Sequence, residues 1–503
     1  GFDYSIKNLP EISVAPPIFI DDRDPNYNWS KTASENEWLR GSGTVGDPYI
    51  ISNLTINGFG GNCIEIKDSE FSNFIIKDTI LFNGSSGIYL DNTRYGNLQN
   101  NLIFNTSVAG INLYSGLFGG VINNTVINNY GHGIYLVGVS SYNEILSNNI
   151  HYNDGNGIYL YSFSNDNNIE NNEVTYNQHG VRLYYGSRFT LIFNNTIEHN
   201  TQHGIYVYQD CEYTDILNNR INFNSQDGIR MQKRSHGFIQ YNILDSNLNY
   251  GMYISNTGYF HHDYISFNTI INSTTGISIR YIDYVDILDN NIYDIAEIGI
   301  YIYRSDNNVI SNNHLVGYSQ AIVEEYSSAN TITNNLCGED LYEENDNFNN
   351  AKAIYKGWTR YLAAKDEDWF YTYLNRGETL YLTIKFLNSS GNLDLGLYND
   401  QNTLLKSSTS ETDNELIVYN ISTGAFYFLR VYNNTNDLYS INIESEDSTI
   451  PSIKIVSPNE DETFRTSPPQ FIIEVHDLNL ETMWYSVNNS QSVIFTFNSS
   501  INS

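Results

Sequence analysis

A glycine followed by an aliphatic residue recurs through most of the chain at intervals of 22 to 25 residues, and this repeat limits the fold more than any other feature. In almost every unit a second aliphatic residue follows two positions later. Side chains alternate between the two faces of a strand, so both aliphatic residues point to one face. The first positions are Ile64, Ile88, Ile111, Ile134, Ile158, Val181, Ile205, Ile229, Met252, Ile277, Ile300 and Ile322. The second positions are Ile66, Leu90, Leu113, Leu136, Leu160, Leu183, Val207, Met231, Ile254, Ile279 and Ile302.

Asparagine recurs at two further places in the same units. One column lies nine residues before the glycine and contains Asn101, Asn124, Asn148, Asn171, Asn195, Asn219, Asn242, Asn290 and Asn312, with Asn268 displaced by one. A second column lies four residues before the glycine and contains Asn83, Asn129, Asn153, Asn200, Asn224, Asn247 and Asn272. Stacked amides hydrogen-bond from strand to strand in ladders, and asparagine also tolerates the left-handed backbone of sharp turns.

These columns predict an all-β chain whose main part is a parallel β-helix of about 12 coils. Each coil of about 23 residues would contain three short strands separated by turns. A single coil cannot bury its apolar side chains, so the coils must stack and share one continuous core. We expect the glycine of each unit to turn the chain.

The residues between and after the aliphatic anchors should point outward. The first such column reads Tyr89, Asn112, Tyr135, Tyr159, Arg182, Tyr206, Arg230, Tyr253, Ser278 and Tyr301, and the second contains Tyr114, Tyr161, Tyr184, Tyr208, Arg280 and Tyr303. We call these two columns the tyrosine strip. Aromatic faces stack on sugar rings and on other proteins, so the strip is a candidate surface for glycans or neighbouring protomers. The alternative is that the tyrosines only stabilise the sheet. The candidate binding residues are Tyr135, Tyr159, Tyr161, Arg182, Tyr184, Tyr206, Tyr208 and Arg230.

The recurring "NNxIxxNxxxGIYL" units and the segment "GSGTVGDPYIISNLTINGFGGNCIEI" (41–66) resemble NosD-like right-handed parallel β-helix proteins over residues 15–340. The resemblance implies a right-handed helix but does not define a function, because enzymes, adhesins and structural rods share this repeat. The family's association with copper draws attention to a column of His132, Asn156, His179, His203 and Asp227 just before the glycines. That column lacks a third strong ligand beside its two adjacent histidines.

A polysaccharide lyase or a glycoside hydrolase is the alternative function. Hydrolases of this kind need paired carboxylates, and lyases need a basic residue beside cation-binding acids. The basic residues gather in one segment, "DGIRMQKRSHG", which contains Asp227, Arg230, Lys233, Arg234 and His236. The acidic residues of the repeat are otherwise scattered, so an enzyme is the weaker hypothesis.

After residue 340 the repeat ends, and six β-rich segments over 343–445 predict a compact β-sandwich. The acidic motif at 343–346 with its following alanine, "DEDWF", "LDLGLYN" and "GAFYFLRVY" resemble the pre-peptidase C-terminal (PPC) domain, a jelly-roll module of secreted prokaryotic proteins. The resemblance implies a structural calcium site, because calcium prefers carboxylate and amide oxygens. Its implied ligands are Glu343, Asn345, Asp346, Asp366 and Asp368. The alternative is that these acids form a solvated linker.

The predicted organisation is therefore a cap and opening segment (1–60), a β-helix (61–340), a PPC-like sandwich (341–447) and an immunoglobulin-like domain that starts at 448. The last segment, with "PPQFIIEVHD" and "ETMWYSVNN", is shorter than the ~100 residues of such a sandwich. We therefore expect the full protein to continue beyond Ser503.

The composition indicates a secreted protein. A net charge of −32 argues against nucleic-acid binding, which needs a basic surface. No apolar run is long enough to span a membrane. The first residue is Gly1, which suggests that a signal peptide has been removed. Cys63, Cys211 and Cys337 show no disulfide or zinc spacing, so we expect most of them to be buried. Glycosylation sequons include Asn28, Asn53, Asn83, Asn272, Asn388 and Asn420. The resulting hypothesis is an extracellular modular surface protein with a structural or adhesive role.

Overall fold

The computed structural model describes residues 14–233, 237–255, 263–338, 340, 342–386, 392–410, 414–433, 438–447, 452–457, 472–476, 483–485 and 493–495. The chain forms two compact units, Gly1–Gly338 and Glu339–Ser503.

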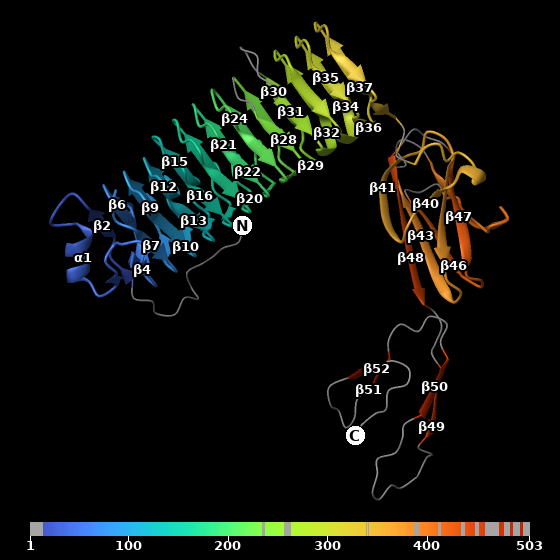
Figure 1. Cartoon of the computed structure of the whole chain (residues 1–503), viewed down its shortest axis with the longest axis horizontal. Coiled ribbons are helices and arrows are strands. Elements are labelled where there is room, and N and C mark those ends of the chain that lie inside the picture. The colour runs from blue at the N-terminus through green and yellow to red at the C-terminus, as the bar shows by residue number, and fades with distance from the viewer. Residues whose placement is uncertain are drawn as a thin grey trace, which may run out of the picture. The chain divides into compact units, whose positions relative to one another are not determined.

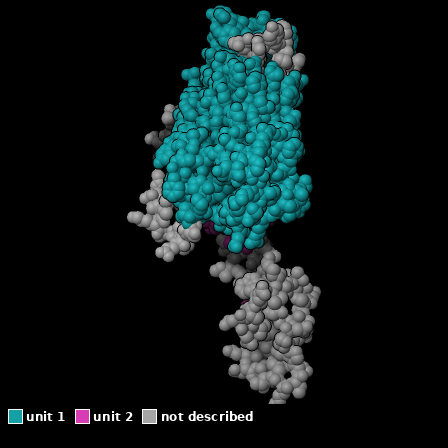
Figure 2. Space-filling view, turned by 90° about the vertical axis from the view of Figure 1, so that its left-hand side faces the viewer, with its two compact units in different colours: residues 1–338 teal, residues 339–503 magenta. Residues whose placement is uncertain are grey.

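The first unit is a parallel β-helix with three strands in each coil (Figure 1). A central coil contains β17 (Asn149–His151), β18 (Ile158–Tyr161) and β19 (Asn168–Glu170). The next coil repeats it with β20 (Glu173–Thr175), β21 (Val181–Tyr184) and β22 (Leu191–Phe193). Each strand pairs in parallel with its counterpart, as β17 does with β20. The coils stack into one elongated body, whose surface is teal in Figure 2.

The strand that carries the repeat's first aliphatic anchor, from Ile64 to Ile322, occurs twelve times among the described residues, in agreement with the predicted number of coils. The other members of this series are β6 (Ile64–Lys67), β9 (Ser86–Asp91), β12 (Ala109–Tyr114), β15 (His132–Val137), β24 (Ile205–Tyr208), β27 (Ile229–Gln232), β30 (Tyr250–Ser255), β32 (Thr269–Arg280), β34 (Asn291–Tyr303) and β37 (Gln320–Glu325). Ile134 pairs with Ile158 and Ile158 with Val181, which is the predicted register.

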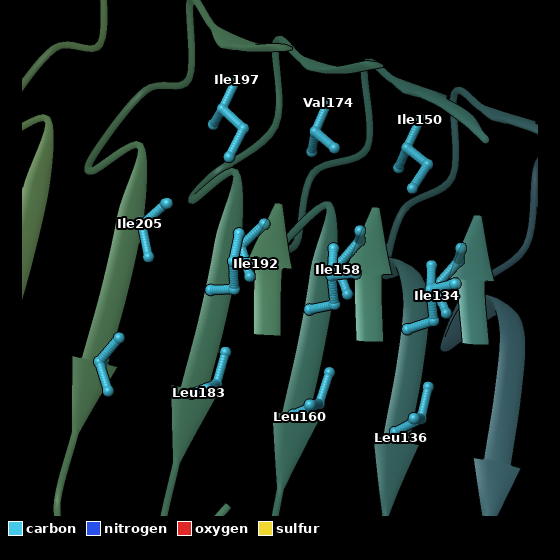
Figure 3. Close-up of a cluster of buried hydrophobic side chains, with 14 of the residues drawn as sticks. Ile134, Leu136, Ile150, Ile158, Leu160, Val174, Leu183, Ile192, Ile197 and Ile205 are labelled. Carbon is cyan, nitrogen blue, oxygen red and sulfur yellow. The ribbon is translucent and has the colours of Figure 1, made fainter. Parts of the chain in front are cut away.

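The core is a set of aliphatic columns that run the length of the helix. Ile134, Ile158 and Ile205 are fully buried and point inward from β15, β18 and β24 of the same strand series (Figure 3). Ile150 and Val174 from the neighbouring strand series complete the same layer. The predicted core is confirmed, because the alternation of the sequence and the pleat of the strand have the same period.

Two buried asparagine ladders line the turns. In the longer ladder the Nδ2 atom of Asn148 donates to Oδ1 of Asn172 at 2.9 Å, and the backbone N–H of Asn148 donates to the same oxygen at 2.9 Å. The Nδ2 atom of Asn148 also donates to the carbonyl of Val121 in the preceding coil. Each amide therefore joins three coils. The longer ladder contains Asn101, Asn124, Asn148, Asn172, Asn195, Asn219, Asn242, Asn268, Asn290, Asn313 and Asn335, and the shorter contains Asn129, Asn153, Asn177, Asn200, Asn224 and Asn247.

The predicted ladders were wrong at four positions. Asn171 and Asn312 are not ladder residues, since each has a positive φ of 56° and occupies the turn beside its ladder neighbour, Asn172 or Asn313. Asn83 and Asn272 also have positive φ and are exposed. The number of residues between the ladder asparagine and the glycine changes by one in some coils. A fixed spacing from the glycine therefore selects the wrong asparagine where two are adjacent, as in Asn171 and Asn172.

The repeating glycine has a different role from the predicted one. The turns are made by other residues with positive φ, such as Tyr152 at 54° and Tyr176 at 58°. A Cβ atom added to Gly157 would lie 2.3 Å from Cγ1 of Val174 and 2.7 Å from the carbonyl oxygen of Gly180. The glycine is therefore required for close packing between coils.

The N-terminal end of the helix carries a cap. The short helix α1 (Trp29–Glu35) begins after Asn28, whose side chain accepts a hydrogen bond from the backbone N–H of Lys31. Trp29 is buried and stacks on Tyr49 with a distance of 4.8 Å between ring centres. This aromatic pair belongs to the same core as the coils, so α1 covers the first coil.

The second unit contains the predicted β-sandwich. One sheet has the order β40-β42-β47-β44-β45 and the other β41-β48-β43-β46. Phe370, Leu382 and Leu429 are fully buried in their shared core. The strands are β40 (Lys352–Ala353), β41 (Gly357–Ala363), β42 (Asp368–Leu374), β43 (Glu378–Lys385), β44 (Asp394–Tyr398), β45 (Leu404–Ser408), β46 (Glu415–Asn420), β47 (Ala425–Tyr432) and β48 (Leu438–Asp447).

The C-terminal segment contains two antiparallel strand pairs. They are β49 (Ser452–Ser457) with β50 (Ile472–His476), and β51 (Met483–Tyr485) with β52 (Val493–Phe495). The other residues from 448 to 503 lie outside the described residues. The immunoglobulin-like domain stays a prediction.

Candidate functional site

The tyrosine strip lies in the predicted register. Tyr135 pairs with Tyr159, Tyr159 with Arg182, and Arg182 with Tyr206 across β15, β18, β21 and β24. The column continues through Arg230 on β27. The second column places Tyr161, Tyr184 and Tyr208 on neighbouring coils. All eight candidate binding residues therefore lie on one continuous surface.

Aromatic rings and guanidinium groups contact one another along the first column, and they alternate between Tyr159 and Tyr253. Tyr135 and Tyr159 stack with 5.1 Å between ring centres. The Cζ atom of Arg182 lies 5.2 Å from the ring centre of Tyr159 and 5.5 Å from that of Tyr206. Cζ of Arg230 lies 4.2 Å from the ring centre of Tyr253. These distances are those of cation–π contacts, which hold each cation flat against its neighbours.

The second column is a row of tyrosines. The ring centres of Tyr161 and Tyr184 are 5.5 Å apart, and those of Tyr184 and Tyr208 are 5.4 Å apart. Tyr161 also stacks on Tyr159 at 5.8 Å, which joins the two columns.

The side chains of the strip are less exposed than predicted. Tyr159 is only 9 % exposed, and Asn112 and Ser278 of the same column are buried. The other candidate tyrosines are half-buried. Adjacent coils lie ~4.8 Å apart, so each side chain covers its neighbours even though all of them point away from the core. Burial raises the pKa of Tyr135, Tyr159 and Tyr206, so their hydroxyl groups stay protonated and can donate hydrogen bonds.

The histidine column beside the strip is part of the scaffold. The Nδ1 atom of His179 accepts the backbone N–H of His203 at 3.2 Å, and Nδ1 of His203 accepts the backbone N–H of Asp227 at 3.1 Å. Nδ1 of His132 accepts the backbone N–H of Asn156 in the same way. These bonds place the proton on Nε2 and leave Nδ1 unavailable to a metal.

Burial, assisted by the positive charge of Arg182, lowers the pKa of His132 to about 4 and that of His179 and His203 to about 3. The rings of His179 and His203 do approach, at 5.2 Å between centres. Both are neutral at physiological pH, and their accepting nitrogens are already occupied. This arrangement does not suit a general base.

Asp227, the acidic residue of the segment "DGIRMQKRSHG", is paired with an arginine of the tyrosine strip. Oδ2 of Asp227, which is fully buried, lies 2.7 Å from a guanidinium nitrogen of Arg230. It is the only carboxylate among the described residues of the two strip columns and the histidine column from β15 to β27. Lys233 is exposed with Nζ 4.6 Å from the ring centre of Tyr208, and Arg234 and His236 lie outside the described residues. A hydrolytic carboxylate pair is therefore not formed in this part of the strip.

The second unit contains an acidic cluster at the start of the sandwich. Carboxylate oxygens of Asp340, Glu343 and Asp368 lie within 4.8 Å of one another, and so do those of Glu343, Asp346 and Asp366. The structure thus brings together all four predicted acids. These groups could hold a metal ion.

The predicted amide ligand also belongs to this cluster. Asn345 is fully buried, and its side-chain oxygen faces only acceptor atoms. With the amide reversed, its nitrogen would donate to Oδ1 of Asp368 at 3.3 Å and to Oε2 of Glu343 at 3.1 Å. In that orientation the amide hydrogen-bonds to two of the acids of the cluster.

Crowding of the acids alters their protonation. Burial, with the charges of Asp340 and Asp366 nearby, raises the pKa of Glu343 to about 7. Burial and the charge of Asp340 raise the pKa of Asp368 to about 9, although the hydroxyl of Tyr439 donates to its Oδ2 at 2.8 Å. The solvated-linker alternative does not describe Asp368, which is fully buried.

Asp340 was not predicted from the sequence. It is 2 % exposed and accepts the backbone N–H groups of Tyr342 and Ala363. The resemblance starts at Glu343, so the only available signal was a further acidic residue three positions earlier.

The sequon asparagines and the cysteines differ in their exposure. Asn53, Asn83, Asn272 and Asn420 are exposed, Asn28 is half-buried at the start of α1, and Asn388 lies outside the described residues. Cys63 and Cys211 are buried and Cys337 is half-buried, all three as free thiols. No helix among the described residues has the length and apolar character to cross a membrane.

Two family models match the first unit. The right-handed β-helix region matches residues 38–193, and the periplasmic copper-binding protein (NosD) family matches residues 160–260 and 256–355. No curated protein sequence matches the chain at a significant level.

Several solved structures are similar at low identity. The catalytic unit of an α-1,3-glucanase from Streptomyces thermodiastaticus is 12% identical, with a TM-score of 0.39, over 58% of this chain and 61% of that one. An A-module of a mannuronan C-5 epimerase from Azotobacter vinelandii is 14% identical, with a TM-score of 0.33, over 58% of this chain and 88% of that one. The pre-peptidase C-terminal domain of a collagenase from Bacillus anthracis is 12% identical, with a TM-score of 0.17, over 19% of this chain and 94% of that one. The family matches and the strand register together identify the first unit as a right-handed parallel β-helix repeat.

Proposed function

We propose that this chain is part of an extracellular or periplasmic modular protein with a structural or adhesive role, and that its β-helix binds glycans on the tyrosine strip. The observation that carries the proposal is the row of aromatic rings and guanidinium groups that contact one another across neighbouring coils from Tyr135 to Tyr206. The fold already has a complete aliphatic core without these side chains. Plain strand stabilisation does not require tyrosine at two adjacent outward columns.

The chemistry of the strip suits sugar rings. Tyrosine faces stack on the C–H faces of sugars, and their hydroxyls donate hydrogen bonds at low entropic cost. The side chains are already held by their neighbours, so little freedom is lost on binding. Several of the solved structures with a similar coil arrangement act on polysaccharides, among them the glucanase and a pectate lyase.

A glycan array probed with the full chain tests this proposal. We expect binding to an extended oligosaccharide, and we expect Tyr161→Ala with Tyr184→Ala to weaken it at least tenfold. The matched control is Tyr176→Ala, since Tyr176 stacks on Tyr152 in a separate exposed column. Absence of binding to every glycan, or equal loss in the control, would reject the proposal. Concentration-dependent self-association lost in the same double variant would instead favour packing between protomers.

We also propose that the acidic cluster of the second unit is a structural calcium site, as the PPC resemblance implies. Glu343, Asn345, Asp346, Asp366 and Asp368 would hold the ion, together with Asp340. Supporting this, Asn345 is fully buried beside the carboxylates of Glu343 and Asp368. A bound divalent cation would neutralise carboxylates that burial otherwise keeps protonated.

Calorimetry of the full chain with and without chelator tests the calcium proposal. We expect calcium to raise the melting temperature of the second unit and to leave that of the β-helix unchanged. Asp368→Asn should remove the calcium response. Exposed Asp400→Asn, in the turn between β44 and β45, is a control with the same change in charge. An unchanged melting temperature with calcium would reject the site.

The exposed sequons are proposed to carry glycans if the protein is made by a cell that glycosylates asparagine. Asn53, Asn83, Asn272 and Asn420 have exposed side chains. Mass spectrometry of the protein from its natural source would identify any modified asparagine.

A further inference from the structure

We propose that the ligand of the tyrosine strip is an acidic glycan, and that Arg182 binds its anionic groups. This inference rests on the proposed glycan-binding function and adds the substrate class. Its chemistry is that of a carboxylate or a sulfate on a sugar chain.

Arg182 differs in its partners from several other arginines of this chain. Arg188, Arg220 and Arg230 each form an ion pair with a carboxylate. Among the described residues no carboxylate pairs with Arg182, although acidic residues outnumber basic ones by 57 to 25. Its guanidinium is surrounded by rings instead, with Cζ 5.2, 5.3 and 5.5 Å from the ring centres of Tyr159, Tyr184 and Tyr206.

This environment prepares Arg182 for an anion. Its Nε atom is buried without a hydrogen-bond partner, so the tyrosine rings rather than hydrogen bonds hold the guanidinium. The side chain as a whole is half-buried on β21. A guanidinium is always charged and offers a planar pair of donors that matches a carboxylate or a sulfate. The rings on either side would stack on the sugar that carries the anion.

The same pattern recurs further along the strip. Arg280 hydrogen-bonds to the hydroxyl groups of Ser278 and Tyr250, and its Cζ lies 4.9 Å from the ring centre of Tyr301. Arg280 has no carboxylate partner among the described residues either. Four coils separate Arg182 from Arg280, which corresponds to roughly 19 Å at the spacing of parallel strands. Two such cations along one face fit a linear polyanion better than a single charged group.

The net charge of −32 does not prevent this binding. At physiological salt the Debye length is about 8 Å, so distant carboxylates are screened from the strip. The two strip columns from β15 to β27 contain no carboxylate among their described residues, and Asp227 of the neighbouring histidine column is paired with Arg230. The charged residues of these columns, Arg182 and Arg230, are therefore both cations.

The experiment compares a polyuronate, a sulfated glycan and a neutral glucan of equal length, using the full chain and isothermal titration in a chelating buffer. The chelator prevents divalent cations from linking carboxylates of the glycan to those of the protein. We expect tighter binding to an anionic chain than to the glucan. Arg182→Gln should weaken binding of the anionic chain by roughly tenfold to a hundredfold, which is the range for a hydrogen bond to a charged group. Binding of the neutral glucan should change less than about twofold.

Two variants control the interpretation. Arg220→Gln removes the same charge from an exposed ion pair outside the strip and should leave both affinities unchanged. Arg182→Lys keeps the charge but not the planar donor pair, so its affinity for the polyuronate should be intermediate. If Arg182→Gln fails to fold, a salt titration of the unaltered protein replaces it. Anionic binding should then fall with rising salt while neutral binding does not.

The outcomes separate the two proposals. Binding of the glucan as tight as that of both anionic chains, or equal loss in Arg182→Gln and Arg220→Gln, would overturn the acidic-glycan inference and leave glycan binding intact. Binding of none of the three would overturn both. Preference for the polyuronate identifies the carboxylate as the recognised group, and preference for the sulfated chain identifies the sulfate.

Discussion

The β-helix and the sandwich place polar groups in their interiors in opposite ways. The helix buries neutral amides, and each amide finds its partner one coil away, as Asn148 does in Asn172. The sandwich buries several carboxylates around a single point, including Asp340 and Asp368. In a repeat, each amide hydrogen-bonds to the equivalent amide of the next coil, so every donor and acceptor is satisfied. A carboxylate cluster that occurs only once needs protons or a cation to balance its charge. The two units should therefore respond differently to mutation, pH and cations.

The largest expected effect is the loss of a ladder amide. Asn172→Leu leaves the backbone N–H and the Nδ2 of Asn148, and the carbonyl of Ile145, without their partners. Each unsatisfied buried group costs about 1–3 kcal/mol, so we expect the β-helix to lose roughly 3–9 kcal/mol of stability. Chemical denaturation monitored by circular dichroism measures the loss. The neighbouring Asn171→Gly, which keeps the turn at positive φ, should cost about 1 kcal/mol or less. Equal losses in the two variants would contradict the ladder assignment.

The second effect is the acid sensitivity of the helix. The folded-state pKa of about 3 for His179 and His203 lies below the ordinary value of 6.5, so the folded state binds fewer protons than the unfolded state. The stability contributed by these groups is complete above pH 6.5 and is lost as the pH falls toward 3, by at most about 1.4 kcal/mol per pH unit for each histidine. Melting temperatures of the helix between pH 7 and 5 measure this loss. His179→Asn, with the residue found at position 156 of the same column, should flatten the dependence. A slope that the variant leaves unchanged would show that other groups cause it.

The sandwich should show the opposite dependence when calcium is removed. The pKa of Asp368 is raised to about 9 and that of Glu343 to about 7, so the folded state binds more protons than the unfolded state. The stability of these groups is complete below pH 4 and is lost as the pH rises through 7 and 9. Calorimetry in chelator should therefore show the second unit melting at a lower temperature at pH 8 than at pH 5. Addition of calcium at pH 8 should restore it, because the ion replaces the protons. A melting temperature that rises with pH in chelator would contradict the raised pKa values.

The smallest effect tests the packing between coils. Gly157→Ala places a Cβ atom against Val174 and the backbone of Gly180, and overpacking of this kind costs about 1–3 kcal/mol. Gly46→Ala is the control, because no atom lies within 4 Å of its added Cβ. Denaturation of the two variants measures the difference. If both were neutral, the glycine would serve some purpose other than close approach.

Much of the β-helix could be predicted because its period is visible in the sequence. The aliphatic anchors gave the core, the number of coils and the register of the tyrosine strip, all of which the structure confirms. Four acids and the amide of the acidic cluster were predicted by resemblance rather than from physical argument. Asp340 was missed, since a site assembled from separate segments has no period to reveal it.

The sequence by itself determined which face of each strand is apolar and how often the coil repeats. Apolar residues recur at every second position within a strand and the whole unit recurs about every 23 residues, and only stacked β-strand coils fit both periods. Only the tertiary structure decided which asparagine of an adjacent pair enters the ladder, that Gly157 permits close contact instead of a turn, and that Nδ1 of His179 is already occupied. It also left Arg182 among tyrosine rings with no carboxylate partner in the described residues. The physical reason is that a period fixes the direction of a side chain, whereas its partners come from the coils above and below.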